Sequence, residues 1–134
     1  MAQLQLDIIT PDLTLIRQEV DYVSATGVEG EFGVLPGHAP LLAALCIGPL
    51  HFQVGDAARY AFIGGGFLEV LDNRVTVLTE VAEMAKDIDV ERAGKAKDRA
   101  ERRLRDAGSE RVDEARAQAA LSRATVRMYV ASMK

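Results

Sequence analysis

The sequence predicts a β plus α protein of two domains, a β-sandwich followed by an antiparallel hairpin of two helices. All 4 prolines and 9 of the 11 glycines fall in residues 1–86, where they separate short apolar runs. Residues 87–134 contain no proline and repeat alanine at helical spacing. Frequent turns are typical of sandwiches and barrels, and alanine-rich segments without proline are typical of helices.

The charge of the chain changes at the same point. Residues 1–86 carry 4 basic and 11 acidic side chains, a net charge of −7. Residues 87–134 carry 12 basic and 9 acidic side chains, a net charge of +3. We therefore place the domain boundary between residues 86 and 87.

Alternation of apolar and polar residues predicts the strands of the first domain. Leu4, Leu6 and Ile8 alternate with polar neighbours, which is the period of a strand with one buried face. The sequence Asp72-Asn73-Arg74 between two later runs favours a tight hairpin. The further strand-like runs are residues 13–16, 19–25, 50–54, 60–63, 67–71 and 75–79.

Steps of three and four residues predict the two helices. The apolar faces are Ala93, Ala96, Ala100, Leu104 and Ala107 in the first helix, and Val112, Ala115, Ala119, Val126 and Tyr129 in the second. Asp87 and Asp89 suit the start of the first helix, where negative charge meets the helix dipole. Gly108-Ser109 favours a turn between the helices, since glycine suits a C-cap and serine an N-cap.

Residues that could perform catalysis are sparse. His38 and His51 lie in no catalytic signature, and His38, within a Pro-Gly-His-Ala-Pro turn, is expected to make structural or partner contacts. Glu29 and Glu31 would point the same way on a strand, but their glycine-rich setting favours contact over acid–base work. The single Cys46 can form neither an internal disulfide nor a Cys-based metal cluster. We expect no catalytic residue and no metal site.

The composition also limits the partners. A formal charge of −4 leaves no basic footprint for nucleic acid. No apolar run approaches the roughly 20 residues that cross a bilayer, so membrane association is expected only through a partner. Residues 64–66 are three glycines without a following Gly-Lys-Ser/Thr, which favours a bulge or close packing over a phosphate loop.

Arginines recur at helical spacing in the second domain. They are Arg92, Arg99 and Arg103 on the first helix, and Arg116, Arg123 and Arg127 on the second. Folding the hairpin at residues 108–109 brings Arg92 opposite position 125, between Arg123 and Arg127. Guanidinium groups gathered there would bind a polyanion such as a phosphate chain. Two alternatives stay open: a solvated basic face paired with acidic neighbours, which spacing alone favours, and a surface that binds an acidic protein.

Three separated motifs occur in order along the chain. They are GEFGVLPGHAPLL at residues 30–42, GGGFLEV at 64–70 with VTVL at 75–78, and DIDVERA at 87–93 with RAERRL at 99–104 and RAQAALSRA at 116–124. Over essentially its whole length the chain resembles the epsilon subunit of bacterial and chloroplast rotary ATP synthases.

The resemblance implies a ten-stranded sandwich and a non-catalytic subunit of the central stalk. The sandwich domain, residues 1–86, would bind the gamma subunit and the ring of c subunits, coupling rotation to proton transport. The loop carrying Glu31 and His38 would face the c-ring. The subunit would lie peripherally on the cytoplasmic side of a bacterial cell membrane, which we favour over the stromal side of the chloroplast thylakoid.

The resemblance also implies that the helical hairpin, residues 87–134, regulates the enzyme. Folded on the sandwich, the hairpin would permit ATP hydrolysis. Extended, it would reach the alpha/beta catalytic head, meet an acidic region of the beta subunit and inhibit hydrolysis. The alternative within the family is a purely structural coupling subunit without physiological ATP sensing.

Some family members bind ATP in the folded hairpin through an Ile-Asp-x-x-Arg-Ala motif and arginines of the second helix. The motif is matched here by residues 88–93. No cofactor is expected to be required, and regulatory ATP would bind with or without magnesium. The implied ATP-binding residues are Glu83, Ile88, Asp89, Arg92, Ala93, Arg99, Arg123 and Arg127. Gly94, beside the motif, is expected to cost the first helix about 1 kcal/mol relative to alanine.

Overall fold

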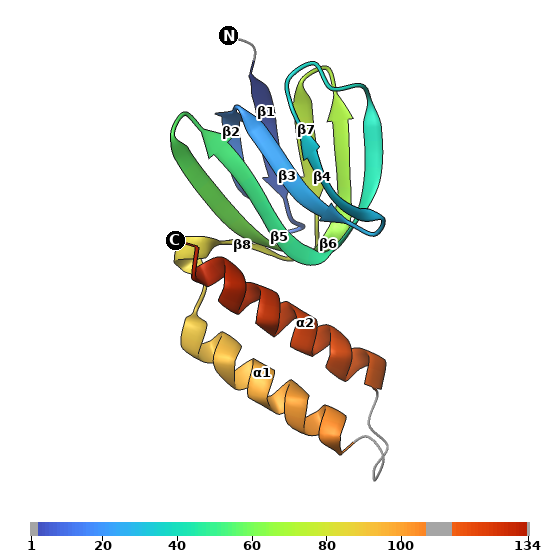
Figure 1. Ribbon diagram of the computed structural model, residues 1–134, viewed down its shortest axis with the longest axis vertical. Helices are drawn as coiled ribbons and strands as arrows, with labels where there is room; N and C mark the ends of the chain where they lie inside the picture. The colour runs from blue at the N-terminus through green and yellow to red at the C-terminus, as the bar shows by residue number, and fades with distance from the viewer. Residues whose placement is uncertain (1–2, 107–113, 134) are drawn as a thin grey trace.

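The computed structural model describes residues 3–106 and 114–133, and it places a β-sandwich beside a pair of helices (Figure 1). The first domain is built from strands and the second from helices, as the sequence predicts. The elements are β1 (Leu4–Ile9), β2 (Thr14–Val20), β3 (Tyr22–Gly27), β4 (Gly30–Val34), β5 (Leu41–Val54), β6 (Ala57–Leu71), β7 (Arg74–Leu78), β8 (Ala82–Met84), the 3₁₀ helix η1 (Ala85–Asp87), α1 (Val90–Arg105) and α2 (Glu114–Ala131).

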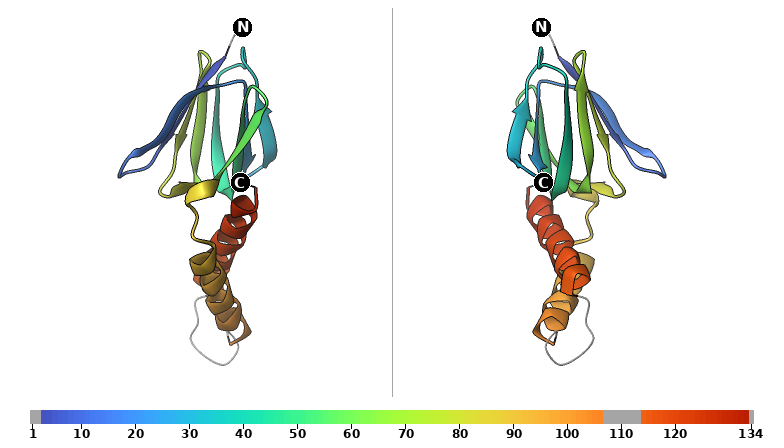
Figure 2. Two further views of the ribbon diagram at one scale, coloured as in Figure 1. Left: turned by 90° about the vertical axis from the view of Figure 1, so that its left-hand side faces the viewer. Right: turned by 90° about the vertical axis from the view of Figure 1, so that its right-hand side faces the viewer.

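The strands form one continuous hydrogen-bonded path that folds into two layers (Figure 2). Their order is β2-β1-β7-β6-β5-β3-β4, and β8 pairs with β6 away from this path. All pairs are antiparallel except β1 with β7. The long strands β5 and β6 pair along most of their length and curve from one layer into the other (Figure 1).

Eight strands are described where ten were expected. The difference lies in β5 and β6, which are continuous for 14 and 15 residues. Their ladder pairs Leu45 with Gly66 and Ile47 with Gly64, and Gly65 and Gly66 between the two halves have φ angles of 91° and 118°. If β5 and β6 were each divided in two at this bend, the strands would number ten, as expected.

The core lies between the two layers of the sandwich. Leu4, Leu6 and Ile8 of β1 are fully buried, which confirms the alternation read from the sequence. Burying each such side chain contributes about 1.5–3 kcal/mol. A β-carbon at Gly66 would overlap the carbonyl oxygen of Leu78, so close packing explains a glycine there, as predicted. The hairpin prediction is also confirmed, because Asp72, with φ of 50°, starts a tight turn between β6 and β7.

Helix α2 lies between the sandwich and α1 (Figure 1). A second apolar cluster joins α2 to the sandwich and the connecting segment, and it consists of Phe62, Ala85, Ile88, Val130 and Ala131. Helix α1 packs on α2, and its first turn follows the linker from β8. The sandwich therefore holds the hairpin chiefly through one helix.

The apolar face expected on the second helix is wrong in part, although Val126 packs against the second apolar cluster as expected. Tyr129 is 52% exposed and Ala115 is exposed, whereas Ala117 and Ala124 are buried. Because α2 packs on α1 and on the sandwich at once, its buried positions follow two directions instead of a single stripe. Val112, Ala107 and the expected turn at residues 108–109 lie outside the described residues.

Candidate functional site

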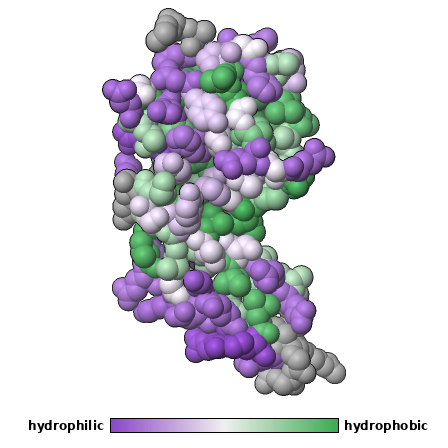
Figure 3. Space-filling view, in the orientation of Figure 1, coloured by the Kyte–Doolittle hydropathy of each residue, from purple (hydrophilic) through white to green (hydrophobic). Residues whose placement is uncertain are grey.

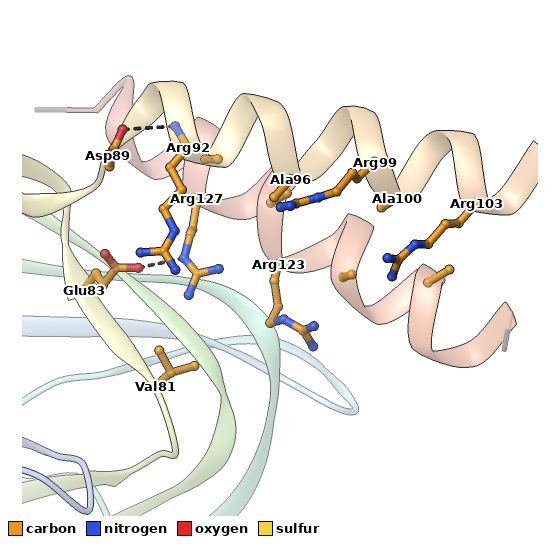
Figure 4. Close-up of a pocket in the computed structure, with 14 residues that line it drawn as sticks. Val81, Glu83, Asp89, Arg92, Ala96, Arg99, Ala100, Arg103, Arg123 and Arg127 are labelled. Carbon is orange, nitrogen blue, oxygen red and sulfur yellow. Dashed lines mark hydrogen bonds and ion pairs between the residues drawn. The ribbon is translucent and has the colours of Figure 1, made fainter. Parts of the chain in front are cut away.

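A cavity of about 620 Å³ opens between the two helices and the edge of the sandwich (Figure 4). Six of its lining residues are alanines, whose small side chains leave the space between the helices unfilled. The lining consists of Val81, Glu83, Asp89, Arg92, Ala93, Ala96, Arg99, Ala100, Arg103, Ala117, Ala120, Arg123, Ala124 and Arg127. Drug-sized ligands occupy pockets of about 300–1,000 Å³, so the cavity has room for a nucleotide.

Five arginines line this cavity against two carboxylates, a formal net charge of +3. Arg92, Arg99 and Arg103 come from α1, while Arg123 and Arg127 come from α2 (Figure 4). Gathered cations repel one another, and an anion bound among them would relieve that repulsion. The surface over α1 is mostly hydrophilic in Figure 3, whereas the buried residues of this helix are Ala93 and Ala100.

Arg127, at one end of the cavity, joins helix α2 to the sandwich. Its Nε donates a hydrogen bond to Oε1 of Glu83 on β8 at 2.7 Å. The two side chains are only 26% and 32% exposed, so solvent screens this ion pair less than a surface pair. The guanidinium also lies 4.3 Å from the ring centre of Phe62, a cation–π contact.

Asp89 caps the first helix at the same end of the cavity. Its Oδ1 accepts a hydrogen bond from the backbone N–H of Arg92 at 3.0 Å, which confirms the predicted acidic start of the helix. The N-terminus of α1 carries partial positive charge. Helix dipole and guanidinium groups therefore favour negative charge in the same part of the cavity.

The structure brings seven of the eight expected ATP-binding residues together in this cavity. The exception is Ile88, which is 5% exposed and packs in the apolar cluster with Phe62 and Val130. Arg103 lines the cavity although it was not among the expected ligands. Arg103 follows Arg99 by four residues, and this spacing already indicated that the two arginines share one face of the helix.

The two expected c-ring contacts do not share a loop. Glu31 lies within β4, where its Oε1 accepts a hydrogen bond from Ser24 Oγ at 3.2 Å. Glu29 lies in the turn before that strand and so does not share its face. His38 lies in the turn between β4 and β5, and its Nδ1 donates to the carbonyl of Ala39 at 2.6 Å.

The remaining site classes have little support in the parts of the chain that the structure describes. Residues 3–106 and 114–133 contain no cluster of three or more His, Cys, Asp or Glu side chains suited to a metal ion. None of the described helices has the length and apolar character needed to cross a bilayer. His51 stacks on Tyr60 with ring centres 4.7 Å apart, which is a packing arrangement.

Two family models match the chain in succession. One, described as the beta-sandwich domain of the ATP synthase delta/epsilon chain, matches residues 3–85. The other, described as the long alpha-helix domain of the same chain, matches residues 86–132.

Curated relatives and a solved structure agree with these matches. The chain is 58% identical over 127 residues to a Nitratidesulfovibrio vulgaris protein named ATP synthase epsilon chain, covering 95% of this chain and 94% of the relative. A Halalkalibacterium halodurans protein of the same name is 46% identical over 131 residues, covering 98% of each. A chain in the Euglena gracilis mitochondrial ATP synthase structure, which comprises OSCP, F1 and c-ring, has a TM-score of 0.83 at 27% identity, covering 100% of this chain and 83% of that one.

Proposed function

Because this chain belongs to the epsilon-chain family of F-type ATP synthases, and is thus a non-catalytic subunit of the central stalk, we propose that its helical hairpin regulates ATP hydrolysis by binding ATP. The observation that carries this proposal is the cavity with five arginines between the helices. Planar guanidinium groups match phosphate oxygens in pairs of hydrogen bonds.

The cavity suits a nucleotide in two respects. The arginines would bind the phosphates, while the alanines and Val81 offer an apolar surface for the base. Glu83 is engaged with Arg127, and Asp89 with the start of α1. Magnesium, if bound with ATP, would therefore be held mainly by the phosphates.

ATP would act by stabilising one of two states of the hairpin. The cavity is lined by α1, α2 and β8 together, so it would lose its present lining if the hairpin left the sandwich. A ligand that binds one state stabilises it by RT ln(1 + [L]/Kd), about 2.7 kcal/mol at a hundredfold excess over Kd. In the folded state hydrolysis would proceed. In the extended state the basic helices would meet the acidic region of the beta subunit in the alpha/beta head and inhibit hydrolysis.

The sandwich domain, residues 1–86, would couple this regulation to the rotor through the gamma subunit and the c-ring. Its outer sheet face exposes apolar side chains that neither α1 nor α2, as described, covers, and these are Leu42, Phe67, Leu71 and Leu78. Such a face supports a protein partner, for which we propose gamma. His38, in its exposed turn, and Glu31 would contact the c-ring. The subunit would then sit peripherally on the cytoplasmic side of the membrane and serve proton transport.

A second candidate is a structural coupling subunit without physiological ATP sensing. The contacts of Arg127 with Glu83 and Phe62 favour it, because they are made between side chains of this chain and dock the hairpin on the sandwich. Under this alternative, ATP concentration would not change the state of the hairpin in the assembled complex.

Removal of residues 88–134 from the assembled ATP synthase tests the regulatory proposal. The hydrolysis rate should rise while assembly is retained, because the inhibitory helices are gone and the sandwich keeps its core. An unchanged rate, with the truncated subunit present at normal stoichiometry, would contradict an inhibitory role.

A further inference from the structure

Two turns at the end of the sandwich away from the helices are joined by one hydrogen bond (Figure 1). The backbone N–H of Gly37 donates to Oδ1 of Asn73 at 2.7 Å. Gly37 belongs to the turn before β5 that carries His38, and Asn73 belongs to the hairpin between β6 and β7. The bond therefore connects segments 36 residues apart in the sequence.

Asn73 is itself held firmly by the sheet. Asp72 and Asn73 have φ angles of 50° and 61°, a left-handed pair that asparagine and aspartate tolerate better than most residues. The carbonyl oxygen of Asn73 accepts a hydrogen bond from the N–H of Gln5 at 2.8 Å, next to β1 and β7. The side chain of Asn73 thus starts from a fixed backbone position.

The turn that carries His38 makes two further hydrogen bonds, and both are local. Gly37 has φ of 84°, and a β-carbon built there would meet nothing within 4 Å. The N–H of His38 donates to the carbonyl of Leu35 at 3.1 Å, and its Nδ1 donates to that of Ala39 at 2.6 Å. Both bonds stay inside the turn. Among the hydrogen bonds of the described residues, the bond to Asn73 joins this turn to another segment of the sandwich.

The fixed turn lies among exposed apolar side chains. Leu35 in the turn is 60% exposed, while Leu42 at 69% and Leu71 at 49% lie close in sequence to the two turns and also belong to the apolar face proposed above for gamma. Ordering a loop before it meets a partner removes part of the entropic cost of association. A turn already held in place would therefore bind more tightly than a free one.

We infer that Asn73 is a positioning residue that holds the His38 turn in the conformation that contacts the membrane rotor. This inference rests on the proposed contact between His38 and the c-ring. Asn73 itself would not contact the c-ring. Its role is to place His38 and its neighbours through the Gly37 N–H.

A pair of substitutions separates the side chain of Asn73 from its backbone conformation. Asn73→Gly keeps the positive φ and removes the acceptor, whereas Asn73→Asp keeps both an acceptor oxygen and tolerance of that φ. Each full-length variant is added to epsilon-depleted ATP synthase in membranes, and its affinity and the ratio of proton pumping to ATP hydrolysis are measured. Loss of one hydrogen bond corresponds to an affinity about two- to tenfold weaker for Asn73→Gly. Asn73→Asp should restore the affinity.

Amide hydrogen exchange of Gly37 supplies the structural readout, and His38→Ala is the reference for the contact itself. The inference predicts faster exchange of Gly37 and weaker coupling in Asn73→Gly, with both restored in Asn73→Asp. If Asn73→Gly binds and couples normally while His38→Ala does not, the role of Asn73 is overturned and the proposed contact stands. If Asn73→Gly and His38→Ala both bind and couple as the unmodified subunit does, the c-ring contact of His38 and the positioning role of Asn73 are overturned together. Equal defects in the Gly and Asp variants would also overturn the positioning role.

Discussion

The side chain of Arg127 links helix α2 to strand β8, with its Nε 2.7 Å from Oε1 of Glu83. The same arginine lines the cavity between the helices. A ligand that binds Arg127 in the cavity would therefore contact a residue that also docks the hairpin on the sandwich. This relationship connects occupancy of the cavity to the position of the hairpin.

Breaking this link should loosen the docked hairpin. Glu83→Gln should lower the free energy of docking by about 1–2 kcal/mol, because it removes the charge from a half-buried hydrogen bond. Hydrogen exchange of α2 amides measures the change, and a double-mutant cycle with Arg127→Gln isolates the pair. Glu91→Gln is the control, since the Glu91–Lys95 pair is 81% and 74% exposed and should contribute little. A coupling energy near zero for Glu83 and Arg127 would contradict the link.

Filling the cavity should compete with ATP. Ala96→Leu adds an apolar side chain to the alanine lining, so ATP binding should weaken while the folded hairpin keeps its stability or gains some. Calorimetric titration measures the binding, and thermal unfolding measures the stability. Ala115→Leu, on an exposed part of α2 outside the cavity, is the control. Equal ATP binding by Ala96→Leu and the unmodified chain would exclude the cavity as the site.

Two glycine substitutions should have opposite effects on stability. Gly94→Ala should stabilise α1 by about 1 kcal/mol, because a β-carbon there meets nothing within 4 Å and alanine favours helix. Gly66→Ala should destabilise the sandwich by at least about 2 kcal/mol, since φ is 118° and the added carbon overlaps the Leu78 carbonyl oxygen. Chemical denaturation of each variant measures both effects. A stabilised Gly66→Ala variant would contradict the packing described at the bend of β6.

Sequence reasoning predicts most of the strands and both helices, because alternation and alanine spacing are local patterns. It does not predict that residues 41–49 continue into one long strand, since Gly48 and Pro49 normally interrupt strands. The structure tolerates Pro49 because the β3–β5 pairing shifts register between Ser24 and Gly27, so the missing N–H falls in a gap of that ladder.

The arginines of the candidate site are also predicted from a local pattern, whereas side chains whose position depends on tertiary docking are not. Arginine spacing places Arg92, Arg123 and Arg127 around one point, and the structure lines one cavity with all three. The burial of Ile88 and the exposure of Tyr129 depend on how α2 sits on the sandwich. That docking is a tertiary relationship without a periodic signal in the sequence.

Acid should remove a stabilising contribution from Asp21. The backbone N–H of Gly55, which donates to Oδ2 at 2.7 Å, and then the Gln3 side chain hold the pKa of Asp21 below its ordinary value of 3.8. Because the pKa is lower in the folded than in the unfolded state, the contribution is complete above the ordinary value. It is lost as the pH falls through the folded pKa. Unfolding of the unmodified chain and of Asp21→Asn, compared across this range, should show a stability difference that shrinks with acid. A difference independent of pH would contradict the assignment.

Calorimetric titration of ATP into the full-length chain measures whether the arginine-lined cavity binds ATP. We expect saturable one-to-one binding that weakens about tenfold or more in Arg92→Ala and in Arg123→Ala, since each substitution removes a charged hydrogen-bond donor. Arg102→Ala should bind ATP normally, because Arg102 lies outside the cavity and its Nε donates to the Asp98 carbonyl. No saturable binding at millimolar ATP, or an equal loss in all three variants, would contradict the claim that the arginine-lined cavity binds ATP.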